Sequence, residues 1–224
     1  SNSNKTTIVV TESVFSMDGD IAPLAEVHSN AVDNNAFLYV DDAHGIGVLG
    51  DKGEGASSIL NSNKNIAIMG TFGKAIATSG AFIASNNNVI DYLINECRHY
   101  VYSTAISPVM AWATKQSIEM IQRDNWRRNK TGELSELFNQ CLDKNIKTTD
   151  SSTSIIGIIV NSEEGAINIA EKLKQRGFWL VAIRPPTVPK GSSRLRVTIN
   201  ALHKPNDIKE LAKAINEEFY LCQK

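Results

Sequence analysis

Apolar residues recur along this chain with the periods of strands and helices in alternation. The strand-like runs of the first half cover residues 7–11, 36–41, 66–70 and 80–84. The helix-like segments between and after them cover residues 24–34, 87–98 and 108–128. Strands and helices in this order predict an α/β fold with a mainly parallel sheet covered by helices.

The second half repeats the alternation on a smaller scale. Expected helices cover about residues 131–145, 166–177 and 208–219, and expected strands cover 155–160, 178–183 and 194–198. We therefore expect a first domain over residues 1–128 and a smaller α/β domain over residues 129–224. A turn-rich segment with three prolines, Arg184–Gly191, separates the last two strands. A rigid loop of this kind often shapes a binding site.

The composition narrows the class of partner. The 224 residues are 42% hydrophobic, enough for a substantial core, and 23 basic against 24 acidic residues give a net charge of -1. This balance provides no field for nucleic acid or an anionic membrane, so we expect a small molecule or a protein as partner. No apolar run approaches the roughly 18–20 residues of a membrane span.

The cysteines and the polar start of the chain bear on its location. Cys97, Cys141 and Cys222 lie far apart without a Cys-x-x-Cys spacing, so we expect reduced packing residues, with no metal site and no disulfide framework. Ser1–Lys5 has no apolar signal-peptide core behind it, which favours the cytoplasm. The apolar strand at residues 7–11 lies so near the terminus that we expect the chain to begin within a domain.

The strongest chemical signal is Lys74, which closes Thr71-Phe72-Gly73-Lys74 and follows Asp41-Asp42-Ala43-His44 by about thirty residues. A buried lysine paired with an upstream acid is typical of proteins that hold pyridoxal 5′-phosphate. The amine forms a Schiff base with the cofactor aldehyde, and a carboxylate at the ring nitrogen keeps that nitrogen protonated, so the ring accepts electrons. The alternative for an isolated lysine is a solvated surface residue.

A glycine pattern in the same region resembles a dinucleotide-binding fingerprint. Gly45-Ile46-Gly47-Val48-Leu49-Gly50 satisfies G-x-G-x-x-G and follows a predicted strand. A nucleotide-binding glycine turn opens directly into a helix, whereas Asp51-Lys52-Gly53-Glu54-Gly55 follows here, and no acidic residue lies about twenty positions on. We therefore expect these glycines to shape an irregular loop past a ligand.

Five blocks occur in a characteristic order: Thr11–Asp20 (TESVFSMDGD), Val40–Gly45 (VDDAHG), Thr71–Lys74 (TFGK), Tyr102–Thr104 (YST) and Ile183–Pro189 (IRPPTVP). Together they resemble the α-oxoamine synthases of the fold-type I, aspartate-aminotransferase-like superfamily, over about Ile8 to Leu221. The resemblance implies that residues 1–128 form the C-terminal part of the large cofactor-binding domain and residues 129–224 the small domain. It also implies that roughly the first two fifths of such an enzyme are absent.

The resemblance implies specific roles around the cofactor. Lys74 is the Schiff-base lysine and later carries the α-proton, Asp41 pairs with the ring nitrogen, and His44 bonds the phenolic oxygen. Asp42 is the rival of Asp41, because strand alternation points neighbouring side chains to opposite faces and only one of them meets the ring. His44 is otherwise a loop histidine with a backbone partner.

Further residues are assigned by the same resemblance. Thr71 binds the phosphate and Ser16 lies beside the ring, close to Asp41 and His44, although both hydroxyl residues could equally be turn or capping residues. Ser103 and Thr104 resemble the segment that reaches the phosphate of the neighbouring subunit, which implies a homodimer with shared active sites.

Two candidates concern the substrate. Arg196 matches the arginine that receives the substrate carboxylate, for which a planar fork is suited, whereas Arg194, on the same strand face, is by default a structural ion-pair residue. Thr187 resembles a substrate-contacting threonine, with a plain turn residue as the alternative.

The implied reaction is a decarboxylative condensation of an amino acid with an acyl thioester. The Ile183–Pro189 block is most similar to the members that use L-alanine and a pimeloyl thioester in biotin biosynthesis, with the acyl group on coenzyme A or on an acyl carrier protein. The alternatives are a glycine-using synthase, such as a 2-amino-3-ketobutyrate ligase or a 5-aminolevulinate synthase, and a non-catalytic subunit or fragment.

Overall fold

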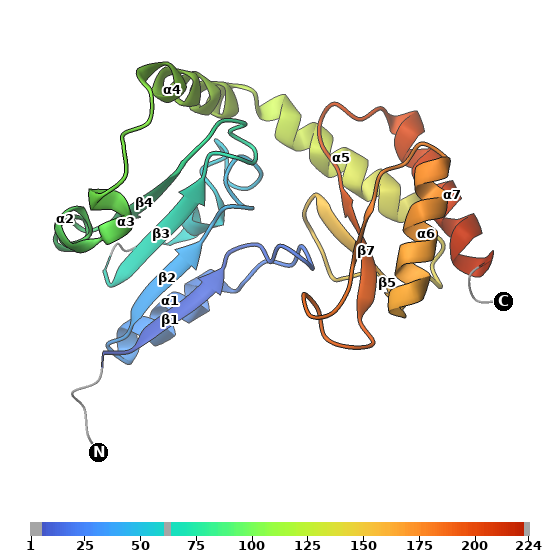
Figure 1. Cartoon of the computed structure of the whole chain (residues 1–224), viewed down its shortest axis with the longest axis horizontal. Coiled ribbons are helices and arrows are strands. Elements are labelled where there is room, and N and C mark those ends of the chain that lie inside the picture. Colours follow the sequence, from blue (N-terminus) through green and yellow to red (C-terminus); the bar gives the residue numbers. More distant parts are fainter. Residues whose placement is uncertain (1–5, 61–63, 222–224) are drawn as a thin grey trace. The chain divides into compact units, whose positions relative to one another are not determined.

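The computed structural model describes residues 6–60 and 64–221, which form two compact units (Figure 1). The N-terminal unit contains the chain up to Val14 and Ile21–Asn125, and the C-terminal unit contains Phe15–Asp20 and the chain from Trp126 onward. A short segment near the start therefore belongs to the unit formed by the second half of the chain.

The N-terminal unit is built on a four-stranded sheet of order β1-β2-β3-β4 (Figure 1). The strands are β1 (Ile8–Glu12), β2 (Phe37–Asp41), β3 (Ile66–Thr71) and β4 (Ala81–Ser85). The first three are parallel and β4 runs antiparallel to β3. The prediction of a mainly parallel sheet is confirmed.

The two faces of this sheet differ in what covers them. Helix α1 (Leu24–Asp33) packs on the face that carries Leu38 and Val40, which are fully buried. The opposite face carries Asp41 and, on the edge strand, Val10, which is 69% exposed. The side chain of Asp41 therefore lies on the more open face.

Among its described residues, the N-terminal unit has three further helices and one 3-10 turn. They are η1 (Ala56–Ile59), α2 (Asn87–Glu96), α3 (Arg98–Val101) and α4 (Pro108–Arg123). The oxygen of Ser107 accepts a hydrogen bond from the Met110 N–H, and Pro108 occupies the first turn, where it removes no helical hydrogen bond.

The C-terminal unit has a three-stranded antiparallel sheet of order β5-β7-β6 (Figure 1). Its elements are α5 (Asn125–Cys141), β5 (Ile155–Asn161), α6 (Glu163–Gln175), β6 (Val181–Ile183), β7 (Ser193–Thr198) and α7 (Pro205–Leu221). Phe138, Ile158, Leu173, Leu195 and Ile215 form the centre of its core, each fully buried. Because side chains alternate along β7, Arg194 and Arg196 lie on the face opposite to this core.

Three predicted element boundaries are wrong. The helix expected over residues 108–128 ends at Arg123, and the next begins at Asn125 rather than at residue 131. The backbone leaves the helical conformation at Asp124, and Asp and Asn compete with helical hydrogen bonding through their side chains. The helix expected over residues 87–98 breaks at Cys97 for the same kind of local backbone change, with ψ of 98°.

The third boundary concerns the strand expected at residues 178–183. It begins only at Val181, because the Phe178 N–H donates to the Leu173 carbonyl at 2.9 Å and closes the end of α6. Gly177, at φ +91°, supplies the left-handed residue that this helix ending uses.

The structure describes two of the three cysteines. Cys97 and Cys141 are free thiols, and Cys222 lies outside the described residues.

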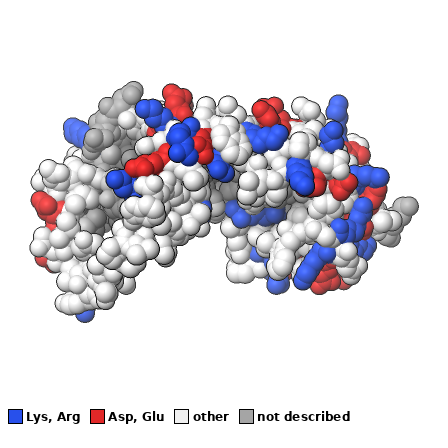
Figure 2. Space-filling view, turned by 90° about the horizontal axis from the view of Figure 1, so that it is seen from above, with Lys and Arg blue, Asp and Glu red and all other residues white. Residues whose placement is uncertain are grey.

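No helix in residues 6–60 and 64–221 is both long and apolar enough to cross a membrane. On the face seen in Figure 2, basic and acidic side chains are interspersed, in keeping with the near-neutral net charge.

Candidate active site

The carboxyl ends of β2 and β3 bring two predicted site residues to one edge of the sheet. Asp41 is the last residue of β2, and Thr71 is the last residue of β3. Asp41 pairs with Met69, so Thr71 lies two residues beyond that register and on the same face. From the strand rise and spacing, the two Cα atoms lie ~8 Å apart. Ligands of parallel α/β sheets bind at this edge.

The two adjacent aspartates, which the sequence left as rivals, have different environments. Asp42 is fully buried and accepts four hydrogen bonds, from the Ser13 Oγ at 2.5 Å, the Ala56 N–H at 3.3 Å, and the Ser57 N–H and Oγ at 3.0 and 2.6 Å. The Asp41 carboxylate is half-buried and accepts from the Ala43 N–H at 2.9 Å. Asp42 is therefore engaged in holding its own loop, and Asp41 is the better candidate for a ligand.

The hydroxyl of Thr71 is buried and makes no hydrogen bond to any described residue. A buried hydroxyl without a partner costs about 1–3 kcal/mol, so such atoms are rare unless a ligand or water satisfies them. An acceptor such as a phosphate oxygen would supply the missing partner, which fits the predicted role of Thr71.

Lys74 lies in the loop that joins β3 to β4. The loop is anchored by Ile76, which is 2% exposed, by a hydrogen bond from the Ser117 Oγ to the Ile76 carbonyl at 2.5 Å, and by the Thr78 and Thr114 hydroxyls at 2.8 Å. Helix α4 therefore fixes the loop at two points. The sequence predicted a buried lysine, but Lys74 is exposed, because the loop turns Ile76 inward in its place.

His44 lies in the irregular turn that follows Asp41. The turn is tied back by the Gly45 and Ile46 N–H groups, which both donate to the Asp42 carbonyl at 3.1 Å. A Cβ on Gly47, at φ +77°, would lie 2.6 Å from the Cβ of Ala75, so the His44 turn and the Lys74 loop approach each other closely. The glycines lead to η1 and not directly to an α-helix, which agrees with rejecting a dinucleotide site.

Ser103 and Thr104 lie between α3 and α4, and both are exposed. The Ser103 Oγ donates to the His99 carbonyl. Large apolar side chains around them are also exposed: Tyr100 64%, Tyr102 79%, Val109 77% and Trp112 65%. An apolar pocket of about 520 Å³ lies next to this region, lined by residues of β3, β4, α2 and α3. A solvent-exposed apolar surface of this kind is typical of an interaction site.

In the C-terminal unit, the two arginines of β7 contact the segment Phe15–Asp20. The Arg196 Nε donates to the Ser16 carbonyl at 2.8 Å, and burial lowers the pKa of Arg196 below its usual value. Arg194 is 5% exposed and forms an ion pair with Asp18, in keeping with the structural role expected for it. Arg196 is the more accessible of the two.

The other two predicted residues of this unit differ in their surroundings. Ser16 is half-buried, and its carbonyl accepts the hydrogen bond from Arg196. Its predicted place beside the cofactor ring, close to Asp41 and His44, stays a prediction. Thr187 is exposed in a turn closed by its own N–H, which donates to the Arg184 carbonyl at 3.1 Å. The neighbouring Val188 is buried and anchors this loop.

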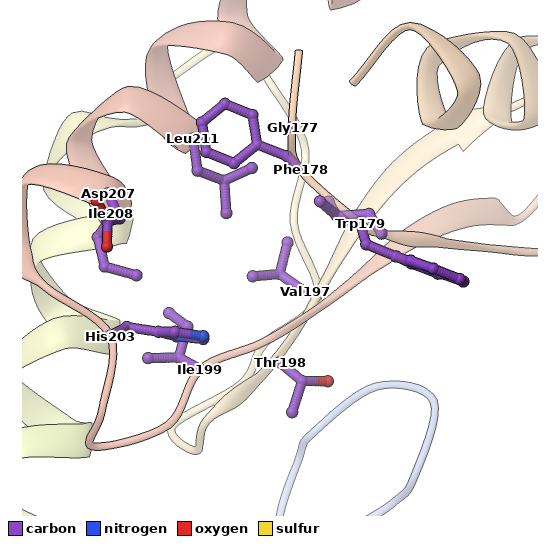
Figure 3. Close-up of a pocket in the computed structure, with 11 residues that line it drawn as sticks. Gly177, Phe178, Trp179, Val197, Thr198, Ile199, His203, Asp207, Ile208 and Leu211 are labelled. Carbon is purple, nitrogen blue, oxygen red and sulfur yellow. The ribbon is translucent and has the colours of Figure 1, made fainter. Parts of the chain in front are cut away.

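A separate pocket of about 300 Å³ lies in the C-terminal unit between α7 and the end of β7. Figure 3 shows Phe178, Val197, Ile208 and Leu211 pointing into it, with His203 at its edge. Neither Arg196 nor Thr187 lines this pocket, so the predicted site residues and this cavity are distinct.

Sequence reasoning missed the partners of Asp42 and Arg194, the neighbours of the predicted Asp41 and Arg196. Ser13 and Ser57 hold Asp42, and Asp18 holds Arg194. Two features of the sequence pointed to the Asp18–Arg194 pair. Asp18 is a charged residue inside the Thr11–Asp20 block, and Arg194 was expected to form an ion pair.

Comparisons with known proteins show the family to which the chain belongs. Residues 1–215 match the family profile of aminotransferase class I and II. The 8-amino-7-oxononanoate synthases of Aliivibrio fischeri (strain ATCC 700601 / ES114) and Aliivibrio salmonicida (strain LFI1238) are 46% and 47% identical, over 96% and 94% of this chain. The chain spans about half the length of these curated relatives, 56% and 55%.

Solved structures show the same relation. A serine palmitoyltransferase of S. paucimobilis with a bound PLP-myriocin aldimine matches with a TM-score of 0.91 and 26% identity, covering 99% of this chain and 57% of that one. An 8-amino-7-oxononanoate synthase of Francisella tularensis matches with a TM-score of 0.84 and 27% identity, covering 99% and 65%. The fold-type I prediction is confirmed.

Proposed function

Because the chain belongs to the aminotransferase class I and II family, we propose that it is part of a pyridoxal phosphate-dependent 8-amino-7-oxononanoate synthase of biotin biosynthesis. The proposed reaction joins L-alanine to a pimeloyl thioester and releases carbon dioxide and the free thiol. Support comes from relatives of that name at 41–47% identity and from the Ile183–Pro189 block. The location in the cytoplasm remains a prediction from the sequence.

One observation carries the cofactor proposal. The buried Oγ1 of Thr71, which has no hydrogen-bond partner among the described residues, lies on the same face as Asp41, three residues before Lys74. A hydroxyl donor, a carboxylate and an amine are the three groups that bind the phosphate, the ring nitrogen and the aldehyde of pyridoxal phosphate. When bound, this cofactor supplies an electron sink for bonds broken at the α-carbon of the amino acid.

The roles proposed for the chain's own residues follow from their chemistry. The Lys74 Nζ binds the cofactor covalently and then carries the proton that leaves the α-carbon. The Asp41 carboxylate keeps the ring nitrogen protonated, since opposite charges favour each other's ionised forms. His44 is the proposed partner of the phenolic oxygen, and Ser16 is proposed to lie beside the ring. The Thr71 hydroxyl donates to the phosphate.

The substrate contacts are proposed in the C-terminal unit. The guanidinium of Arg196 binds the alanine carboxylate through its planar fork, and Thr187 contacts the substrate from its turn. Because the Arg196 Nε is already bonded to Ser16, the terminal Nη groups are the ones assigned to the carboxylate. The pimeloyl group is proposed to come from coenzyme A or from an acyl carrier protein.

We further propose a homodimer in which Ser103 and Thr104 reach the phosphate held by the other subunit. The support is the exposed apolar surface around them, which includes Tyr102 and Trp112. Burying such side chains is what drives stable association of two copies.

Chemical fixing of the cofactor tests the site. The chain is incubated with pyridoxal phosphate, reduced with borohydride and digested, and the modified peptide is identified by mass spectrometry. We expect the modification at Lys74 in the wild type and in Lys52→Ala, a control that changes an exposed lysine of the same unit. In Lys74→Ala we expect neither modification nor a visible absorbance band. Retention of that band in Lys74→Ala would refute the assignment.

Substrate preference tests the reaction. Thiol release from pimeloyl-coenzyme A and from pimeloyl-carrier protein is measured with L-alanine, glycine and L-serine. Turnover with L-alanine supports the proposal, and turnover with glycine alone favours the glycine-using synthases. Cofactor fixed at Lys74 without any turnover would make this chain a non-catalytic part.

A further inference from the structure

The segment Phe15–Asp20 is held in the C-terminal unit by side chains that follow α5. The Thr149 Oγ1 donates to the Asp18 carbonyl at 2.6 Å, and the Thr153 Oγ1 donates to the Gly19 carbonyl at 3.0 Å. A Cβ on Gly19, at φ +77°, would lie 2.0 Å from the carbonyl oxygen of Ile155, so the segment lies directly against β5. Such close packing leaves the backbone of this segment little freedom.

Two arginines bind this segment side by side. Arg194 is buried, its Nη1 pairs with the Asp18 carboxylate, and its Nε donates to the Ser192 carbonyl at 3.0 Å. Two residues further along β7 and on the same face, the Arg196 Nε donates to the Ser16 carbonyl. The Ser16 carbonyl that orients Arg196 is therefore only two residues from the Asp18 carboxylate that Arg194 fixes.

This arrangement gives the two arginines different tasks. A guanidinium has five N–H donors in a fixed fork, and Arg194 uses donors from both ends of its fork within the protein. Arg196 has its Nε bonded to Ser16, which fixes the plane of the guanidinium and directs its terminal groups. A bidentate bond to a carboxylate needs that plane to be set in advance, because misplacement by an ångström is costly.

We propose that the Asp18–Arg194 ion pair is a positioning device, which fixes the Ser16 carbonyl and thereby presents the Arg196 guanidinium to the carboxylate of the amino-acid substrate. The inference rests on the proposed function, in which Arg196 binds that carboxylate. Asp18 and Arg194 are positioning residues that act through Ser16 and Arg196. A merely structural pair would change stability and leave the orientation of Arg196 unchanged.

Nuclear magnetic resonance of the arginine Nε–H groups tests the device without turnover. The Arg196 signal is assigned by its loss in Arg196→Lys, and its exchange with water is measured in the wild type, Asp18→Asn, Asp18→Glu and Asp20→Asn. We expect slow exchange in the wild type and at least about tenfold faster exchange in Asp18→Asn, because that variant weakens one charge-assisted hydrogen bond. In Asp18→Glu, which restores the carboxylate, we expect slow exchange again. Asp20→Asn, a change of charge in the same segment, should behave as the wild type.

The same samples are then titrated with L-alanine and with L-alaninamide, which lacks the carboxylate. We expect L-alanine alone to shift the Arg196 signal, and its apparent dissociation constant to rise about tenfold in Asp18→Asn. Backbone spectra of β5 and β7 confirm that each variant is folded, and Thr149→Val, which loosens the Asp18 backbone without changing charge, should give a smaller effect in the same direction.

The outcomes separate the two proposals. If L-alanine leaves Arg196 of the wild type unaffected, the carboxylate role of Arg196 is wrong, whatever the exchange data show. If L-alanine shifts Arg196 but folded Asp18→Asn exchanges and binds as the wild type does, the positioning device is refuted and the proposed function stands.

Discussion

Replacing the buried carboxylate of Asp42 should destabilise the N-terminal unit far more than the same change at Asp41. Asp42→Ala leaves the Ser13 and Ser57 hydroxyls and two backbone N–H groups without their acceptor. Breaking a buried charged network of this kind costs about 3–5 kcal/mol, and we expect ~4 kcal/mol here. Asp42→Asn keeps the volume and one oxygen, so a single backbone N–H faces an amide donor and the expected cost is ~2 kcal/mol.

The contrast with Asp41 decides which aspartate serves the cofactor. Asp41 is half-buried and accepts one assigned hydrogen bond, from Ala43, so Asp41→Asn should cost about 1 kcal/mol or less. It should nevertheless abolish most pyridoxal phosphate binding, because a neutral amide cannot keep the ring nitrogen protonated. Asp42→Asn should have the reverse profile, with weaker folding and cofactor binding retained wherever the chain stays folded.

Hydrogen exchange read by mass spectrometry measures both effects in one chain. Opening free energies of β2 and β3 report the N-terminal unit, and those of β7 serve as an internal reference in the other unit. The reasoning is refuted if Asp42→Ala leaves β2 and β3 as protected as in the wild type, or if Asp41→Asn destabilises them more than Asp42→Asn does.

Two further predictions concern single groups. Thr71→Val removes a buried hydroxyl that has no partner within residues 6–60 and 64–221, so without cofactor it should be neutral or stabilise by up to about 1 kcal/mol in urea unfolding. It should weaken pyridoxal phosphate binding in a spectral titration. Thr78→Val, which breaks a made hydrogen bond to Thr114, should instead destabilise the chain without cofactor. The backbone N–H of Asn145 and the Tyr220 hydroxyl lower the pKa of Asp143, so its stabilising effect is fully present above the unfolded value of about 3.9 and is lost as pH falls through the lower folded value. The urea midpoint of Asp143→Asn should therefore lie below that of the wild type at neutral pH and converge with it in acid, and a constant difference across this range would contradict the assignment.

The periods of apolar residues were sufficient to predict the type and order of most elements, because burial on one face imposes a period of two on strands and about 3.6 on helices. Element ends were less predictable. The break at Asp124 and the late start of β6 depend on single backbone conformations and on one helix-ending hydrogen bond, which leave no apolar pattern. The predicted burial of Lys74 was wrong because the conformation of the β3–β4 loop also leaves no apolar pattern. In this loop the Ile76 side chain is buried and Lys74 is exposed.

The residues that select among candidates are distant in sequence from the residues that they support. Strand alternation places Asp41 and Asp42 on opposite faces, but only hydrogen bonds from Ser13 and Ser57, which are 29 and 15 residues away from Asp42, give Asp42 a structural task. In the C-terminal unit, Asp18 and Arg194 are separated by 176 residues. A local pattern can predict that a side chain is charged and which face it occupies, whereas its partner is decided by which segments the fold brings together. The role of each aspartate and arginine therefore depends on the tertiary contacts, and the paired substitutions at Asp41 and Asp42, and at Asp18 and Asp20, measure that dependence directly.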